Sequence, residues 1–91
     1  MARNFRVEIS RTPNGVHLHL QGDFDGSSAH VLANTLETHR NGSGRIVVHT
    51  EGLTNLLPFG VAVFQDHLRL VKKGPATVVF TGENRERMVL G

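Results

Sequence analysis

The chain contains no cysteine, no tryptophan and no tyrosine. The missing cysteines exclude disulfides, thiolate nucleophiles and cysteine-based zinc sites together. The five phenylalanines are not interleaved with clusters of lysine and arginine, so the sequence does not indicate a nucleic-acid-binding surface. We therefore expect no nucleic-acid partner, and no motif calls for a cofactor.

Long apolar runs are also missing. No stretch approaches the ~18–20 consecutive apolar residues of a membrane-spanning helix. Ten lysines and arginines stand against eight aspartates and glutamates, and the formal net charge of +2 indicates no basic patch. Residues 1–4 lead directly into a strand pattern, which leaves no room for a signal peptide. The sequence therefore predicts a cytoplasmic domain without a membrane partner.

The first pattern that is present is a hairpin. Apolar and polar residues alternate over 4–9, and again over 16–21, as in strands buried on one face. Between them, residues 11–15 contain Pro13 and an Asn-Gly pair, which favour a turn. The two segments predict an antiparallel hairpin.

After the hairpin, helix and strand patterns alternate. An apolar stripe over 29–36 predicts an amphipathic helix. The β-branched segments 45–50 and 76–81 are typical of strands buried on both faces, and 85–90 begins a further helix. The 91 residues therefore predict one domain over 1–91, of the α/β class. Its single mixed sheet would have four to five strands, the hairpin first and then parallel β-α-β units, with helices packed on it.

The segment 52–73 is the one around which the chain is organised. Residues 52–55 read as a polar turn after a strand, and Pro58 suits the first turn of a helix, where its missing N–H needs no partner. Two lysines followed by Gly-Pro at 72–75 favour a helix end. The pattern predicts a strand-to-helix elbow and a helix over 58–73.

The apolar arc of this helix covers about half of its circumference, which is wider than the ~100° stripe of an ordinary surface helix. Phe59 and Val63 lie on one side of the arc, and Val61 and Phe64 on the other. One interpretation is a helix packed between a sheet and a neighbouring helix. The other is that the arc near Phe59 and Val61 is a docking surface for another protein.

Histidines are the first candidates for chemistry. His17 and His19 would share one face of a strand as a partial metal site, or be ordinary polar-face residues. Zinc needs three or four ligands, and no further ligand lies at a defining spacing, so we expect no metal site. His67, inside the apolar arc, is expected to be a hydrogen-bonded core or interface histidine.

Carboxylates and serines are the other candidates. Asp23 and Asp25 could act as a pair, but no acid or base partner is specified, and turn or cap roles are the alternative. Ser27 and Ser28 are of a type that caps helices, and the chain has no G-x-S-x-G motif. We therefore expect no enzyme.

In order and spacing, these motifs resemble the STAS domain family, the bacterial anti-sigma-factor antagonists and their relatives. The resemblance rests on Gly22-Asp23-Phe24-Asp25, on Ser28-Ala29 and on RIVVHTEGLTNLLPFGV at 45–61, and it extends from Phe5 to Leu90. It implies the fold predicted above and a role in signalling and transcription regulation through protein–protein interaction. It also implies that the family's last helix is cut short here.

The elbow departs from the family pattern. Aligned on Gly60 and Val61, the family's Asp-Ser-Ser-Gly is replaced by Leu-Pro-Phe-Gly at 57–60. In antagonists of this family, a serine or threonine at the position of Pro58 is phosphorylated by the partner kinase, which releases the complex. Because proline has no hydroxyl, the resemblance implies a domain that this modification cannot switch.

The leading hypothesis is a non-enzymatic STAS-like interaction domain whose partner is an anti-sigma-factor-type kinase or another STAS subunit. The expected partner-binding residues are Leu57, Pro58, Phe59, Gly60, Val61 and Phe64. A second loop that could bind a ligand or partner contains Asp23, Asp25, Ser27 and Ser28. Two alternatives remain open: a sensor domain that binds a nucleotide or another small ligand, and a structural subunit that self-associates, for example as a homodimer.

Overall fold

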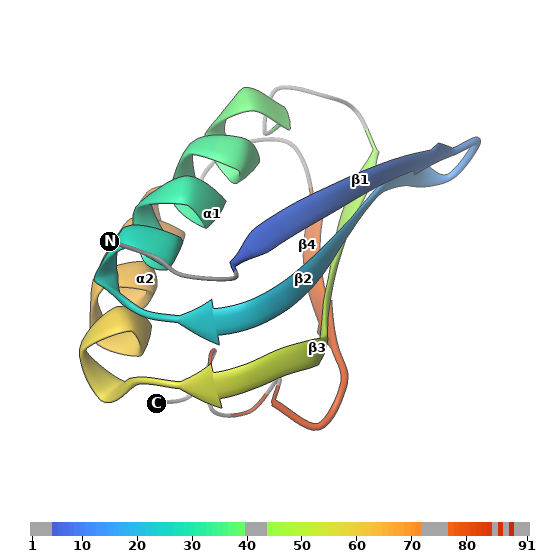
Figure 1. Cartoon of the computed structure of the whole chain (residues 1–91). Coiled ribbons are helices and arrows are strands. Elements are labelled where there is room, and N and C mark those ends of the chain that lie inside the picture. The colour runs from blue at the N-terminus through green and yellow to red at the C-terminus, as the bar shows by residue number, and fades with distance from the viewer. Residues whose placement is uncertain (1–4, 40–43, 72–76, 85, 87, 89–91) are drawn as a thin grey trace.

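The computed structural model describes residues 5–39, 44–71, 77–84, 86 and 88, and it places two helices against one face of a four-stranded sheet (Figure 1). In chain order the elements are β1 (Arg6–Thr12), β2 (Gly15–Phe24), α1 (Gly26–His39), β3 (Arg45–Leu56), α2 (Pro58–Val71) and β4 (Thr77–Thr81). The strands are ordered β1-β2-β3-β4, with β1 antiparallel to β2 and the other two pairs parallel. The predicted mixed sheet is thereby confirmed.

The hairpin of β1 and β2 has a shorter turn than the sequence indicated. The strands pair as far as Thr12 and Gly15, so Arg11 and Thr12 belong to β1 and not to the turn. Pro13 and Asn14 make the turn, and the Asn14 N–H donates to Thr12 Oγ1 at 3.3 Å. The continuous register puts alternate apolar residues of both strands on one face of the sheet.

β3 is longer than predicted. The sequence indicated a strand over 45–50 followed by a polar turn, but the strand continues to Leu56. Its second half pairs with the end of β2, past two register shifts that follow His19 and Gly22. Leu53 and Leu56 are both 9% exposed. Their burial against the core outweighs the low strand propensity of the glycine and asparagine between residues 52 and 55.

β4 lies at an edge of the sheet in the part of the chain that the structure describes. The prediction of a strand buried on both faces is wrong here, because β4 pairs with β3 alone and none of its residues is fully buried. A β-branched run suits an edge strand as well as a central one, so it does not distinguish them. β3 is a central strand, and its residues 46–48 are buried, but Arg45 and His49 on its other face are exposed and half-buried, so the prediction holds only for the middle of the strand.

The core lies between the sheet and the helices. β2 and β3 direct alternate residues towards the helices, and α1 contributes its predicted apolar stripe over 29–36. The rings of Phe24, Phe64 and Phe80 meet edge to face across this layer. The largest fully buried apolar side chains are Phe24, Phe64, Leu18, Leu20, Leu32, Leu36, Ile46, Met88 and Val48.

The other face of the sheet is not covered by either described helix, and we call it the open face (Figure 1). Strand alternation places on it the residues between the core positions, among them Glu8, His17, His19, His49 and Thr81. The fold is therefore a two-layer arrangement, in which one face of the sheet packs on helices and the other carries mostly polar side chains, with Val47 and Val79 among them.

Two predicted segments reach beyond the described residues. The end of the helix predicted at Lys73 is one, since α2 is described as far as Val71. The helix expected over 85–90 is the other: Met88 is fully buried there, and its N–H donates to the Asn84 carbonyl at 3.2 Å. Among the described residues, no helix has the length and apolar character needed to cross a membrane.

Candidate functional site

The elbow (residues 56–61) joins β3 to α2. Pro58 is the first residue of α2, as predicted, and the Val61 N–H donates to the Leu57 carbonyl at 3.1 Å to close the first turn. The Leu57 N–H donates to the Phe24 carbonyl at 3.0 Å. These backbone bonds fix the elbow to the end of β2, beside the start of α1.

Gly60 allows the starts of the two helices to meet. Gly60 is buried, and a β-carbon at this position would lie 2.6 Å from the carbonyl carbon of Asp25 and 2.7 Å from its oxygen. These atoms are backbone and cannot turn away as a side chain could. The glycine of the elbow therefore has a structural reason that is independent of any partner.

The first turn of α2 presents an apolar surface to solvent. Phe59 is 72% exposed and Leu57 is 44% exposed, and Pro58 between them is also exposed. We call these three residues the elbow patch. One edge of the Phe59 ring rests on Gly26, where a β-carbon would lie 2.9 Å from the ring. A shallow depression beside the ring is lined by Asp25, Gly26, Ser27, His30, Phe59 and Val63.

The other predicted partner-binding residues lie beneath the elbow patch. Phe64 is fully buried, Gly60 is buried, and Val61 is partly buried against the core. These residues hold the patch in place and do not offer surface of their own, except for part of Val61. The inner side of the apolar arc is thus a packing surface, and its N-terminal end remains exposed. His67 contacts His30 across the interface of α2 and α1, with ring centroids 5.3 Å apart.

The Asp23–Ser28 loop is held together by its own hydrogen bonds. The Ser28 N–H donates to Asp25 Oδ1 at 2.9 Å, so Asp25 caps α1, and this bond holds the pKa of the Asp25 carboxyl below its ordinary value. Ser28 Oγ lies 2.7 Å from the Asp23 carbonyl oxygen and 3.0 Å from Asp25 Oδ1. Asp23 Oδ1 accepts a bond from Asn55 Nδ2 at 2.9 Å. The two carboxylates therefore bind different partners and do not act on one point.

The structure brings a third histidine to the His17–His19 pair. His49 of β3 pairs with His19 in the parallel register, and its ring stacks on those of His19 and His17, with centroids 4.3 and 5.1 Å away. His17 Nδ1 lies 2.9 Å from His49 Nε2, and His49 Nδ1 lies 3.0 Å from Thr81 Oγ1. Sequence spacing missed His49 because only the parallel pairing of β2 with β3 brings it there.

These stacked rings do not form a metal centre. Imidazole nitrogens donate in the plane of the ring, and nearly parallel stacked rings do not direct them to one point. In the described ranges, no group of three or more His, Asp or Glu side chains is arranged to hold a metal ion.

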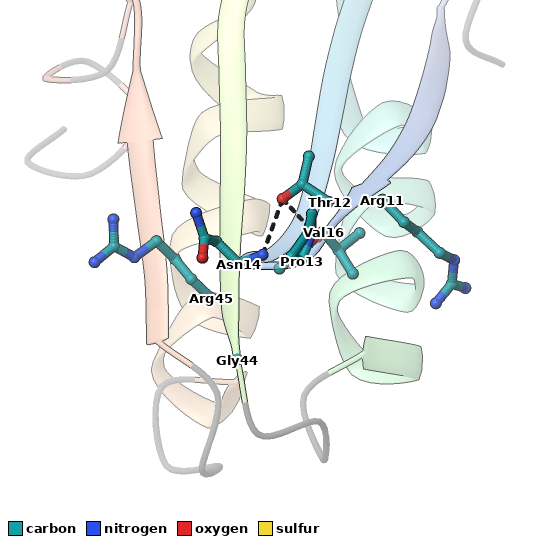
Figure 2. Close-up of a pocket in the computed structure, with 8 residues that line it drawn as sticks. Arg11, Thr12, Pro13, Asn14, Val16, Gly44 and Arg45 are labelled. Atoms are coloured by element: carbon teal, nitrogen blue, oxygen red, sulfur yellow. Dashed lines mark hydrogen bonds between the residues drawn. The ribbon is translucent and has the colours of Figure 1, made fainter.

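A second depression lies at the tip of the hairpin, next to Gly44 and Arg45 (Figure 2). Two arginines border it, which would suit an anion if their side chains met. Figure 2 shows that the side chains of Arg11 and Arg45 extend to opposite sides, so they do not form an anion clamp. The Thr12 hydroxyl, also at this site, is occupied by hydrogen bonds within the turn.

Comparison with known proteins gives fold-level matches. No family's sequence profile matches the chain, and no curated protein matches it in sequence. Among solved structures, the anti-sigma factor antagonist SpoIIAA in its unphosphorylated form aligns with a TM-score of 0.58 at 18% identity. That alignment covers 91% of this chain and 78% of SpoIIAA.

Structures of a protein named Mglu align over a small part of their length. One has a TM-score of 0.73 at 20% identity over 86% of this chain, and the L-glutamate binding form also has 0.73, at 14% identity over 90%. The chain spans 20% and 27% of those two proteins. At these identities the likeness shows the fold alone. The fold is therefore SpoIIAA-like, and SpoIIAA is a structural neighbour of similar size.

Proposed function

We propose that this chain is a non-enzymatic regulatory domain that binds a protein partner through the elbow patch, in the manner of an anti-sigma-factor antagonist. The observation that carries the proposal is the exposure of Phe59, a residue that is 72% exposed at the first turn of α2. A large aromatic side chain exposed at the start of a helix is a typical anchor for a protein interface.

The proposed partner is an anti-sigma-factor-type kinase or another STAS subunit. The similarity to SpoIIAA in fold supports this class of partner, and the apolar elbow supports the location of the contact. Pro58 offers no phosphate acceptor, so phosphorylation at this position would not release the complex. A phosphate at this position would have added about −1.5 to −2 charge.

Other hydroxyls near the site differ in their access to a kinase. Ser28 is fully buried and Ser27 is partly buried, whereas Thr54 at the end of β3 is exposed. Thr54 is therefore the neighbouring hydroxyl that a kinase would reach without opening the fold.

The test is calorimetric titration of the chain with anti-sigma-factor-type kinases encoded in the same genome. We expect Phe59→Asp to weaken binding by at least about tenfold, because it removes the anchor and places a charge in an apolar contact. Val31→Asp is the matched control, since Val31 on α1 is 45% exposed and lies outside the elbow patch. Equal affinity of wild type and Phe59→Asp would reject the elbow patch as the interface. Release on addition of ATP, for wild type and for Thr54→Val alike, would reject a complex that phosphorylation does not switch.

The nucleotide-sensor alternative stays a prediction, and one observation weighs against binding of an anionic ligand beside Phe59. Asp25 lines the depression beside Phe59, and the hydrogen bond from the Ser28 N–H lowers the pKa of Asp25. Its carboxylate is therefore ionised at neutral pH and would repel a phosphate group at that position.

A further inference from the structure

β1 is an edge strand with a regular, unpaired side. Its seven residues pair with β2 in continuous register from Arg6 to Thr12, without a bulge or a proline. In the described part of the sheet it has no second neighbour. A regular edge of this kind presents backbone N–H and C=O groups that can accept another strand.

The helix-facing side of β1 is also incompletely covered. Val7 is partly buried, but Ile9 is 49% exposed, although it stands opposite the fully buried Leu18. On α1, Val31 is 45% exposed. His30 of α1 contacts α2, and Val31 lies about 100° further around the helix, on the flank turned away from α2. Apolar surface is therefore left on the side of the molecule where β1 is the last strand.

We propose that β1 pairs with β1 of a second copy of this chain, in an antiparallel arrangement centred on Val7. This inference is independent of the partner proposed for the elbow patch. In that register, Arg6 of each copy stands opposite Glu8 of the other, and Phe5 of each copy stands opposite Ile9 of the other. Arg6 and Glu8 lie on the open face, where their cross-strand neighbours on β2 are Gln21 and His19.

The charges favour this register. Opposite charges on directly facing residues of an antiparallel pair are stabilising, and like charges are destabilising. Centring the pair on Glu8 would place the two Glu8 carboxylates against each other, and centring it on Ile9 would form no pair of opposite charges, whereas centring it on Val7 forms two Arg6–Glu8 pairs. Charges on an edge strand usually prevent association. Here their signs alternate, so they prevent it in one register and favour it in another.

The symmetry of the pair also accounts for the exposed apolar residues. Antiparallel edge pairing about a two-fold axis extends the sheet and keeps the helices of both copies on the same face. The uncovered Ile9 of each copy would meet Phe5 of the other. The flanks of the two α1 helices that carry Val31 would lie on either side of the axis. A single strand contact buries less than a standard interface, so we expect a weak, concentration-dependent dimer.

The experiment is analytical ultracentrifugation from micromolar to millimolar concentration. We expect wild type to dimerise and both single charge variants, Arg6→Glu and Glu8→Arg, to raise the dissociation constant by at least about tenfold. An equimolar mixture of the two variants should restore the dimer. In the mixed pair, one copy carries negative charges at both positions and the other carries positive charges at both, so each facing pair is of opposite sign. The double variant R6E/E8R should dimerise with itself. Circular dichroism confirms that each variant is folded.

Several outcomes would overturn the proposal. A wild-type chain that stays monomeric at millimolar concentration rejects the dimer, as do single variants that dimerise like wild type. If the mixture stays monomeric, the register is wrong. If Phe59→Asp abolishes dimerisation and the β1 variants do not, self-association uses the elbow patch instead, and this result leaves the proposed kinase interaction to be judged by its own titration.

Discussion

On the open face, His49 has both imidazole rings and a carboxylate as neighbours. The imidazoles of His19 and His17 on β2 stack beside it, Thr81 of β4 lies at hydrogen-bond distance from its Nδ1, and the Glu51 carboxylate is 3.7 Å from the same nitrogen. Glu8 of β1 stands opposite His19 in the next strand. Burial first, and then the neighbouring histidines, lower the pKa of His49, and Glu51 opposes them only in part.

We predict that this lowered pKa makes the fold sensitive to mild acid. Below about pH 6.5, the unfolded chain protonates this histidine more readily than the folded chain does. The free energy of unfolding therefore falls as the pH drops through that value towards the lower folded pKa, and stays unaffected by His49 above it. Urea denaturation at a series of pH values measures this slope.

His49→Gln should flatten the dependence, because it removes the titrating group from the stack. His39→Gln, at the end of α1 and outside the stack, is the control and should keep the wild-type slope. An identical slope in wild type and His49→Gln would contradict the assignment.

Among the elements, the pair of helices depends on one close approach. α1 and α2 start side by side because Gly60 leaves room for the Asp25 backbone. Intrinsic propensity alone favours alanine over glycine in a helix by about 1 kcal/mol. We nevertheless expect Gly60→Ala to lower the free energy of unfolding by about 2–4 kcal/mol, because the helix starts must separate to admit a methyl group.

Chemical denaturation measures this change, and Ala62→Gly on the exposed side of α2 provides the comparison. That control should cost only about 1 kcal/mol, the propensity term. A Gly60→Ala protein at least as stable as wild type would show that the helices separate without cost.

The elements themselves were predicted to different extents. Alternation and turn residues sufficed for the hairpin, and Pro58 marked the first residue of α2. The second half of β3 was missed because its glycine, threonine and asparagine have the composition of a turn, and its pairing with β2 is a tertiary effect. The position of β4 at an edge was missed for a related reason, since strand order is not encoded in the pattern of one strand.

At the scale of the whole molecule, the fold could be predicted from the sequence, but only part of the candidate site could. The resemblance at the elbow identified Phe59 as a candidate contact for a partner, and the exposure of Phe59 is consistent with that role. It could not show that Gly60 and Phe64 lie beneath the surface, because depth depends on how α1 packs against α2. The histidine stack and the free edge of β1 likewise exist only once strands from separate parts of the chain are paired.

Leu57 stands at the N-cap position of α2, where serine, threonine, aspartate or asparagine would accept a hydrogen bond from the first turn. Leucine has no such acceptor, so we expect Leu57→Ser to raise the free energy of unfolding by up to about 1 kcal/mol, measured by urea denaturation. The same change removes apolar surface from the elbow patch and should weaken the proposed complex with a kinase. A serine variant that loses stability, or that gains it without losing affinity, would contradict this.

At the elbow, the stability of the fold and the affinity for a partner would then favour different residues. Selection for stability alone would favour a polar residue at position 57. A leucine at this position is therefore expected where binding of the partner matters more than the stability of the fold.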